Sequence, residues 1–325
     1  MKNVFYKPPS RNVLQEIGCF MANIAAIVVA YIPDEKKLLR LLSALSDQVS
    51  AIYILDNTPS DKIDWCNHYL IENVGSLFRY VPLGKNYGIA HAQNIGIKFA
   101  ADEGFKHLIF FDQDSWVPPK LVDGLIESEN RLLALGEKVG SIGPLFLDEK
   151  SGQYSEAVRY TGFFVRKIKI SPMQIEPIES DHIISSGSLI KLDTLKEVGN
   201  MQEELFIDLV DTEWCLRAAK RHYKHYINPS TVMIHNIGDE PVKFGSKSIN
   251  IHSPIRSYYV IRNMTYLLFH SKISWRWRLN CIYKIPRYIW IFICITPKKN
   301  KFNIAILLIR AFFSGLFIQL GDQCR

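Results

Sequence analysis

LIFFDQDS, residues 108–115, joins four apolar residues to two carboxylates that stand one residue apart. A short apolar run between a glycine and a pair of prolines predicts a strand buried on both faces of a parallel sheet. Ligands of such sheets gather beyond the carboxyl ends of the strands, which is where Asp112 and Asp114 stand. On an extended backbone the two side chains point the same way and can share one hard cation, so the stretch predicts a metal-diphosphate site. For an isolated D-x-D the alternative to a metal site is a solvated acidic turn. The motifs in the rest of the chain are needed to choose between these two interpretations.

Length and composition predict a globular chain with a large core. The 325 residues are 48% hydrophobic and 22% charged, which suits one large domain with an appendage or two domains. The six cysteines are scattered without C-x-x-C spacing, and the first residues lack the apolar segment of a signal peptide. These features predict free thiols in a reducing cytoplasm.

The net charge of +7 is concentrated at the C-terminal end. Residues 271–325 carry ten Lys or Arg and one acid, a net of +9, so residues 1–270 sum to −2. A basic excess confined to an apolar, tryptophan-rich tail is typical of a membrane surface and not of a nucleic-acid groove. The apolar stretch 302–320 could just span a bilayer, but Arg310 near its middle would cost about 2.5 to 3.5 kcal/mol on insertion scales. We therefore expect helices that lie in the membrane interface, and helices that simply pack on the rest of the protein are the alternative.

Apolar runs of strand length alternate with helical patterns on both sides of the D-x-D stretch. They cover residues 24–30, 51–55, 78–83 and 139–147. Strand-helix units in this order predict a doubly wound α/β sheet. Between residues 154 and 184 short β-like runs are broken by prolines, which favours a hairpin or a flap over one end of the sheet.

Polar residues follow several of the predicted strands. Asp56 and Asn57 stand at the carboxyl end of the second strand, in a loop rich in turn residues. The stretch GKNYG at 84–88 opens a helix with small residues on one face, which permits close packing on the sheet. Asn86 and Asn94 can offer amide hydrogen bonds to a ligand or can cap and turn the backbone, and the residues alone do not choose.

A second acidic cluster, FIDLVDTEWCLR at 206–217, follows a predicted strand at 183–192 that Gly187 interrupts. Glycine within a strand often marks the close approach of another backbone or of a ligand. Asp208 is expected to cap the helix that follows, and Asp211 lies in the first turn of that helix. Asp211 gains a role in chemistry only if the two acidic clusters meet across a cleft.

The last motif before the tail is a predicted strand at 231–234 that ends in His235. A lone histidine at a strand end is more often structural than a metal ligand, and its claim rises if it faces Asp114. Glu213 and Arg217 are i,i+4 partners on the helix after the second acidic cluster. The polar segment 239–253 is expected to be a mobile loop that closes on a substrate.

The order of these motifs closely resembles that of family 2 glycosyltransferases, and within them the bacterial rhamnosyltransferases of O-antigen and cell-wall polysaccharide assembly. The resemblance covers about residues 22–270 and rests on seven motifs in the right order. They are the strand-end Asp56, N-x-G…A-Q-N-x-G at 86–96, D-Q-D-S at 112–115, S-S-G at 185–187, the acidic cluster at 206–217, H-N-I-G-D at 235–239 and R-S-Y-Y-x-x-R-N at 256–263.

The resemblance implies a GT-A fold, an inverting mechanism, and Mg²⁺ or Mn²⁺ held on the diphosphate of a nucleotide-sugar donor, most closely dTDP-L-rhamnose. Matched position by position, Asp211 is the general base and Asp114 is a metal ligand. Asp112 lies near the ribose or the metal, His235 lies near the metal and the diphosphate, and Asp56 contacts the pyrimidine base. Further donor contacts are expected from Asn57, Asn86, Gly88, Asn94, Gln113 and Arg217, and acceptor or flap contacts from Ser186, Gly187 and Trp214.

One departure from the family concerns Val210-Asp211, where many relatives carry Glu-Asp. The base itself is present, so the departure weakens the expected acceptor contacts and leaves the chemistry intact. That chemistry needs a divalent ion to neutralise charge on the departing nucleoside diphosphate, and one base opposite the leaving group.

The motifs and the charge pattern together predict three parts: an N-terminal extension at 1–22, a GT-A catalytic domain at 23–252, and a helical, membrane-associating region at 253–325. We expect a peripheral enzyme at the cytoplasmic face of the inner membrane, acting on a lipid-linked oligosaccharide and not on nucleic acid. A metal-dependent nucleotidyltransferase is one alternative, although no Gly-rich basic loop follows the first strand. A catalytically silent membrane-bound assembly factor is another.

Overall fold

The computed structural model describes residues 23–62, 77–149, 151–235, 241–244, 247–250, 253–270, 273–296 and 300–317. For residue 235 and for residues 241–244 and 247–250 it describes the backbone alone. The predicted N-terminal extension lies outside the described residues, as do residues 239–240, 245–246 and 251–252 of the predicted loop at 239–253.

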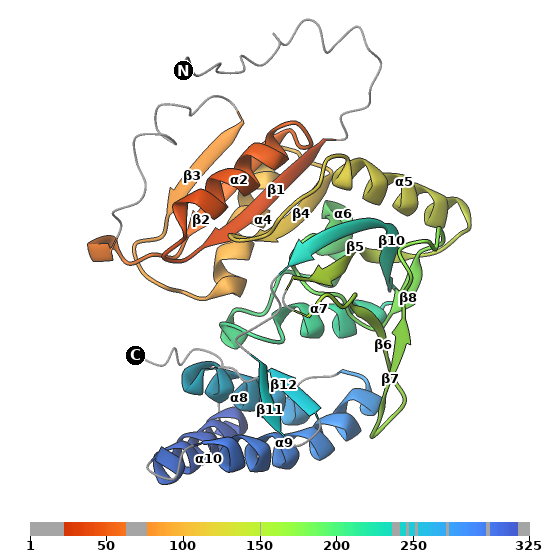
Figure 1. Ribbon diagram of the computed structural model, residues 1–325. Helices are drawn as coiled ribbons and strands as arrows, with labels where there is room; N and C mark the ends of the chain where they lie inside the picture. Colours follow the sequence, from red (N-terminus) through yellow and green to blue (C-terminus); the bar gives the residue numbers. More distant parts are fainter. Residues whose placement is uncertain are drawn as a thin grey trace, which may run out of the picture.

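An eight-stranded mixed sheet forms the centre of the molecule (Figure 1). In spatial order its strands are β3 (Phe78–Pro82), β2 (Ala51–Asp56), β1 (Ile24–Ala30), β4 (His107–Asp112), β9 (Leu189–Lys191), β5 (Val139–Asp148), β10 (Lys224–His235) and β8 (Ile178–Ser180). The first four are parallel, as are β5 and β10, whereas β9 is antiparallel to both of its neighbours and β8 is antiparallel to β10. The prediction of a mostly parallel sheet is confirmed. The predicted strand at 183–192 is wrong in its first half, where Ser188 N donates to Ser185 O at 2.9 Å and closes a turn.

Helices cover both faces of the sheet, which explains why its strands read as continuous apolar runs. Ala25 and Ile27 of β1 face one core, and Ala26 and Val28 face the other. The helices of this α/β part are α2 (Glu35–Ser46), α4 (Ile89–Asp102), α5 (Leu121–Ala134), α6 (Leu192–Val198) and α7 (Val210–Ala219), with short 3-10 turns η1 (Ser60–Lys62) and η2 (Glu203–Leu205). The predicted small face of α4 packs on the sheet: a Cβ on Gly96 would come within 2.8 Å of Ile27.

The predicted hairpin between residues 154 and 184 is present as β6 (Glu156–Tyr160) paired with β7 (Val165–Lys169). A second small hairpin, β11 (Pro241–Phe244) with β12 (Lys247–Asn250), precedes the tail. The tail forms three helices, α8 (Pro254–His270), α9 (Trp275–Ile295) and α10 (Lys301–Phe317), which lie together on the side of α7 (Figure 1).

One face of the tail helices packs on the α/β part. Trp277 and Leu308 are buried in the same core as Trp214 of α7, so the packing alternative holds for that face. In the described part of the chain, no tail helix is both long enough and apolar enough to cross a membrane.

Candidate active site

The carboxyl ends of β1, β2 and β4 meet at one edge of the sheet. In the sheet register Ala30 of β1 stands opposite Asp56, and Val29 stands opposite Asp112. The predicted placement of both aspartates at strand ends is confirmed, and they flank the end of β1 where ligands of such sheets bind. Their contacts with a donor stay predictions.

Asp56 is fully buried, and both of its carboxylate oxygens accept hydrogen bonds from the protein. Thr58 N donates to one oxygen at 2.9 Å and the Tyr80 hydroxyl donates to the other at 2.8 Å. Asp56 therefore fixes the loop after β2 and ties that loop to β3.

Asn57 and Asn86 shape the 84–88 loop. Asn57 Oδ1 accepts from Tyr87 N at 3.1 Å, and its Nδ2 donates to Gly88 O at 3.1 Å. Asn86 Oδ1 accepts from Gly88 N at 2.9 Å, which closes a local turn. For Asn86 the structure shows the backbone-turning role that the sequence left open. Asn57 holds the same loop, which stands beside Asp56, and its predicted donor contact stays a prediction.

Gly88 is the point where the 84–88 loop meets the second acidic cluster. Its φ is +89°, and a Cβ there would lie 2.6 Å from Phe206. Ile89 N, at the start of α4, donates to Phe206 O at 2.7 Å. Glycine is required here both by its backbone conformation and by this close approach.

The D-x-D motif forms a turn and not the extended arrangement that we expected. Asp112 is the last residue of β4, and Ser115 N donates to Asp112 O at 3.2 Å, so Asp114 lies within the turn. The argument from alternating strand side chains is therefore wrong for Asp114, although both carboxylates remain half-buried at the sheet edge. Gln113 turns to the neighbouring loop, where it accepts from Tyr31 N at 2.7 Å and donates to Tyr31 O at 3.2 Å.

The Ser185–Ser186 turn joins the two acidic clusters. Ser186 Oγ accepts from Asp112 N at 3.3 Å and lies 2.6 Å from Ser115 Oγ. On the other side Ser185 N donates to Asp211 Oδ2 at 3.2 Å. One two-residue turn thus connects Asp211 to the D-x-D turn, and the role of Asp211 in chemistry stays a prediction.

Gly187 completes this turn with a φ of +74°. Its N–H donates to Phe110 O at 2.7 Å, and a Cβ would lie 2.8 Å from Pro144. The close backbone approach that the sequence predicts is present, and the partner is the D-x-D strand itself.

Asp211 is a half-buried carboxylate in the first turn of α7. Burial raises its pKa from 3.8 to about 6, a shift that the hydrogen bonds from Thr212 N and Ser185 N oppose and the nearby charge of Asp208 supports. Thr212 N donates to Oδ1 at 2.6 Å. A carboxylate with this pKa is ionised at neutral pH and is still basic enough to accept a proton, which suits a general base.

A small cavity of about 10 Å³ lies beside Asp211, which is the single acid among the described residues that line it. Its wall includes Gln93 of α4, to which the sequence analysis assigned no role. Gln93 Nε2 donates to Ser185 Oγ at 2.7 Å, while its Oε1 is buried without a hydrogen-bond partner among the described residues. Gln93 thus steadies the turn that holds Asp211, and its side chain gave no sequence signal beyond its place in A-Q-N.

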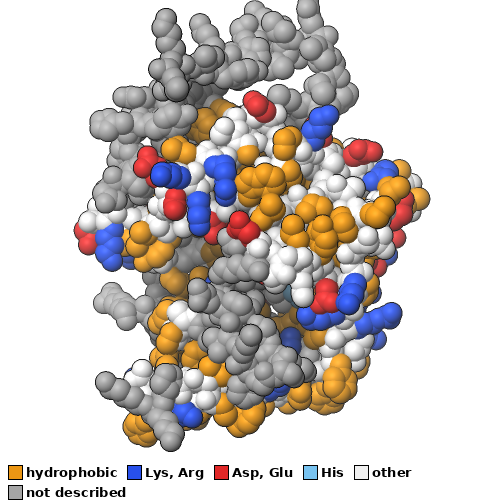
Figure 2. Space-filling view, in the orientation of Figure 1, with side chains coloured by type: hydrophobic (Ala, Val, Ile, Leu, Met, Phe, Trp, Pro, Cys, Tyr) orange, Lys and Arg blue, Asp and Glu red, His pale blue; other side chains and the backbone are white. Residues whose placement is uncertain are grey.

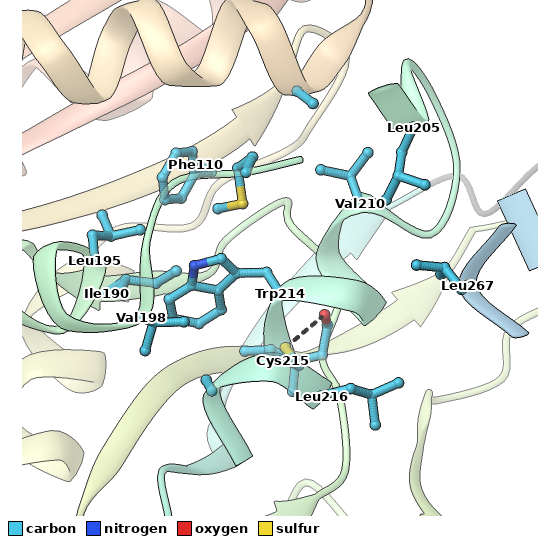
Figure 3. Close-up of a cluster of buried hydrophobic side chains, with 14 of the residues drawn as sticks. Phe110, Ile190, Leu195, Val198, Leu205, Val210, Trp214, Cys215, Leu216 and Leu267 are labelled. Carbon is cyan, nitrogen blue, oxygen red and sulfur yellow. Dashed lines mark hydrogen bonds between the residues drawn. The ribbon is translucent and has the colours of Figure 1, made fainter. Parts of the chain in front are cut away.

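Asn94, Trp214 and Arg217 were predicted to touch substrates. They instead hold the chain between α6 and α7. Asn94 bonds to both the N–H and the carbonyl of Met201, each at 2.9 Å. The indole N–H of Trp214 donates to Gly199 O at 2.9 Å, and Trp214 is 1% exposed. Figure 3 shows its ring among Phe110, Ile190, Leu195 and Val198, which is a core position and corrects the predicted acceptor contact.

Arg217 serves the same segment. The expected ion pair with Glu213 is confirmed at 2.8 Å, and the remaining guanidinium hydrogens reach Val198 O at 2.8 Å and Asn200 O at 2.7 Å. We therefore assign Arg217 a positioning role for this segment in place of the predicted donor contact.

Asp208 does not cap α7, contrary to the sequence-based expectation. Leu209 is the residue before α7, and the backbone of Asp208 has a φ of +64°, outside the extended region that a capping residue adopts. Its carboxylate instead forms a salt bridge with Arg256 of α8. Two guanidinium nitrogens donate to Oδ1, Nη2 at 3.0 Å and Nε at 3.1 Å.

The D-x-D turn suits a divalent ion that takes part of its shell from a phosphate ligand. Two carboxylate groups offer hard oxygen ligands, and Mg²⁺ commonly uses one or two carboxylates together with substrate phosphates. The described residues include no cluster of three or more His, Cys, Asp or Glu placed to hold a metal. Trp116 N donates to Ile234 O at 3.3 Å and so brings the backbone of His235 beside this turn, while the His235 side chain lies outside the described residues.

Solved structures with the same fold are glycosyltransferases, and the fold and sheet edge described above define a protein of the GT-A class. GalNAc-T7 crystallised with UDP, GalNAc and Mn²⁺ gives a TM-score of 0.56 over 90% of this chain and 55% of that one, at 13% identity. Residues 1–349 of S. aureus TarS in complex with UDP-GlcNAc give a TM-score of 0.53 over 90% of this chain and 81% of that one, at 12% identity. At these identities the likeness is one of fold alone.

Sequence comparison identifies the family. Residues 25–199 match the model of Glycosyl transferase family 2. The dTDP-rhamnosyl transferase RfbF of Shigella flexneri is 38% identical over 255 residues, which are 76% of this chain and 80% of that protein. The chain therefore belongs to the family 2 glycosyltransferases, and the resemblance seen in its motifs is confirmed. The low-salt glycan biosynthesis hexosyltransferase Agl10 of Haloferax volcanii is 21% identical over 251 residues, 75% of this chain and 76% of that one.

Proposed function

We propose that this glycosyltransferase transfers L-rhamnose from dTDP-L-rhamnose, with inversion, to a lipid-linked polysaccharide precursor such as that of O-antigen. The observation that carries the choice of donor is the 38% identity to the Shigella flexneri dTDP-rhamnosyl transferase over 76% of the chain. The sheet edge supports it, because Asp56 and Asp112 flank the end of β1 where a nucleotide would bind.

In this proposal the residues of the two acidic clusters divide the chemistry. Asp112 and Asp114, with His235, would hold Mg²⁺ or Mn²⁺, which when bound supplies positive charge to the leaving diphosphate. Asp211 takes the proton from the acceptor hydroxyl as that oxygen attacks the anomeric carbon from the side opposite the diphosphate. Inversion follows from a single displacement, which needs one base and no nucleophilic carboxylate.

The test is incorporation of sugar into lipid. The purified protein is incubated with Mg²⁺, a lipid extract of the producing organism, and one radiolabelled donor at a time: dTDP-L-rhamnose, UDP-GlcNAc, UDP-galactose or GDP-mannose. We expect label in the lipid fraction from dTDP-L-rhamnose, and a product whose anomeric configuration by NMR is opposite to that of the donor. Use of another donor alone refutes the sugar, retention refutes the mechanism, and consumption of nucleoside triphosphates in place of sugar nucleotides points to a nucleotidyltransferase.

We further propose that the tail docks at the cytoplasmic face of the inner membrane, where a lipid-linked acceptor would lie. In Figure 2 hydrophobic side chains gather along the lower rim, over the position of α9 and α10 in Figure 1. The exposed aromatic residues of these helices include Trp275, Tyr283, Trp290, Phe302, Phe313 and Phe317. Arg276, Arg287 and Arg310 are exposed on the same two helices. Aromatic and cationic side chains in one surface suit the headgroup region of an anionic bilayer.

Co-sedimentation with vesicles tests the docking. Trp290 and Phe302 are 59% and 76% exposed, so Trp290→Glu with Phe302→Glu should weaken binding to phosphatidylglycerol vesicles by roughly tenfold or more for each apolar side chain withdrawn from the interface. Leu135→Glu is the control, because Leu135 is 75% exposed at the end of α5, away from the tail. High salt should weaken binding only in part, since apolar burial persists when charges are screened. Wild-type protein that stays in the supernatant with vesicles at low salt would refute the docking.

A further inference from the structure

The loop that leads into the helix of Asp211 has an unusual backbone. Phe206, Asp208 and Leu209 have φ values of +62°, +64° and +63°, a region that residues other than glycine rarely adopt. Phe206, with ψ of −66°, centres a γ-turn that a hydrogen bond of 2.7 Å from Ile207 N to Leu205 O closes. Strained backbone of this kind persists only where the surrounding structure holds it.

Asn263 of α8 binds three backbone carbonyls of this loop. Its Nδ2 lies 2.8 Å from Leu205 O, 2.8 Å from Ile207 O and 2.9 Å from Asp208 O. Asn263 is 0% exposed, so without its amide these carbonyls would lose a donor where water does not replace it.

Arg262, the preceding residue, adds a second set of bonds and fixes the amide. Its Nη2 donates to Glu204 O at 2.6 Å and to Leu205 O at 2.9 Å. The same guanidinium donates to Asn263 Oδ1 from Nε at 2.9 Å and from Nη2 at 2.7 Å. The bonds to Oδ1 decide which way the amide faces and point its Nδ2 at the loop.

Other contacts of α8 reinforce this side of the loop. Tyr259 stacks on Phe206 with ring centres 4.9 Å apart, and Arg256 pairs with Asp208. On the opposite side Phe206 O accepts from Ile89 N of α4. The loop is therefore held between the donor-side helix and the first tail helix.

The loop of residues 205–209 leads directly into α7, the helix that carries Asp211. Leu209 O accepts the first helical bond of α7 from Glu213 N at 2.9 Å, and Asp211 is the second residue of that helix. The direction of the first turn of α7, and with it the direction of the Asp211 carboxylate, therefore depends on the shape of the loop.

We propose that Asn263 and Arg262 are positioning residues for the general base: they hold residues 204–208 in the strained shape that aims Asp211 at the acceptor hydroxyl. The inference rests on the proposed role of Asp211 and adds to it the α8 residues of the R-S-Y-Y-x-x-R-N motif, for which the sequence suggested no task. Asp56 and the D-x-D turn lie at the sheet edge, so we expect donor affinity to depend less on these two side chains than turnover does, although Phe206 also contacts the 84–88 loop.

Asn263→Ala is the test, with Asn280→Ala as its matched control. Asn280 of α9 is also buried and also donates to a backbone carbonyl, Phe163 O at 2.9 Å, in the β6–β7 hairpin. Label transfer from dTDP-L-rhamnose to the lipid extract gives kcat and KM, and calorimetry with dTDP and Mg²⁺ gives donor-site affinity. Asn263→Ala should lower kcat by roughly ten- to hundredfold, the range that a misplacement of about 1 Å produces, with dTDP affinity within about threefold of wild type. Asn280→Ala should keep kcat.

Each possible result supports or overturns either the proposed function or the positioning role. Absence of transfer by the wild type is a failure of the proposed function, whatever the variants do. Transfer by the wild type with kcat of Asn263→Ala within about twofold overturns the positioning role, and so does a fall of dTDP affinity in proportion to kcat. Should Asn263→Ala not fold, Arg262→Lys replaces it, because lysine keeps the charge but cannot bond to Glu204 O and the Asn263 amide together. The same fall in kcat with retained dTDP affinity supports the proposal, and an unchanged kcat overturns it.

Discussion

Replacement of Asp211 by asparagine separates the chemistry of the site from its structure. The side chain keeps its size and loses its basic oxygen. General-base catalysis contributes about 10²- to 10⁴-fold, so we expect kcat/KM to fall by that factor, roughly 3 to 5 kcal/mol of transition-state stabilisation. Donor affinity should survive, because the two strand-end aspartates and the D-x-D turn are unchanged.

The stability of Asp211→Asn depends on two opposing terms. Burial raises the pKa of Asp211 from 3.8 to about 6, so the folded state binds this proton more tightly than the unfolded state does. The contribution of Asp211 to the free energy of unfolding is therefore largest below pH 4, falls as the pH rises to about 6, and costs at most about 3 kcal/mol above that. Asparagine removes this cost. In the wild type Ser185 N donates to Oδ2 of Asp211. Asparagine places an amide N–H there instead, and the loss of this acceptor for Ser185 N costs about 1 to 3 kcal/mol.

The two terms offset each other, so Asp211→Asn should fold with a stability near that of wild type and without the change between pH 4 and 6. The assay is release of dTDP from dTDP-L-rhamnose in the presence of lipid acceptor, from pH 5 to 8, beside calorimetry with dTDP. Wild-type kcat/KM should rise up to about pH 6 and then level off, because that limb reports the base of the free enzyme. Turnover by Asp211→Asn within about threefold of wild type, or the same acid limb in its residual activity, would refute the assignment of the base.

Four further substitutions probe the donor site, the segment between α6 and α7, and the packing of the tail helices. Asp114→Ala should abolish Mg²⁺-dependent binding of dTDP with the fold retained, and Asp112→Ala should do less; affinity that neither chelator nor Asp114→Ala alters would remove the metal from the proposal. Asn94→Ala should cost about 1 to 3 kcal/mol in urea unfolding with dTDP affinity unchanged, whereas weakened dTDP binding at normal stability would return Asn94 to the donor site. Gly315→Ala should lower the unfolding temperature by an amount equivalent to about 1 to 3 kcal/mol, because the new Cβ would lie 2.3 Å from Arg262 O; an unchanged transition would show that α8 and α10 part easily.

The fold and the sheet edge follow from local patterns. An apolar run that ends in a carboxylate indicates a buried strand and its carboxyl end, and Asp56 and Asp112 stand where that pattern places them. The register that puts both beside β1 follows from parallel pairing of neighbouring strands. A strand-end site of this kind can be predicted from the sequence because its residues directly follow their strand.

The roles of Asn94 and Asp208 were not predictable in the same way. The amide of Asn94 bonds to a residue 107 positions later, and a side chain that can bind a ligand can equally bind a distant carbonyl. Asp208 has the residue type of a helix cap, but its left-handed backbone, imposed by contacts with α8, sends its carboxylate to Arg256. Long-range partners decide both cases, and no local pattern encodes them.

The match to the family model ends before Asp211. The family model matches residues 25–199, which include the strand ends, the 84–88 loop and the D-x-D turn. Asp211 and the helix that holds its loop lie beyond that match, and Phe206 contacts both parts, through Ile89 N on one side and Tyr259 on the other. Residues 205–209 thus join the matched part to α8, and α8 packs at Gly315 against α10, one of the helices that we propose face the membrane.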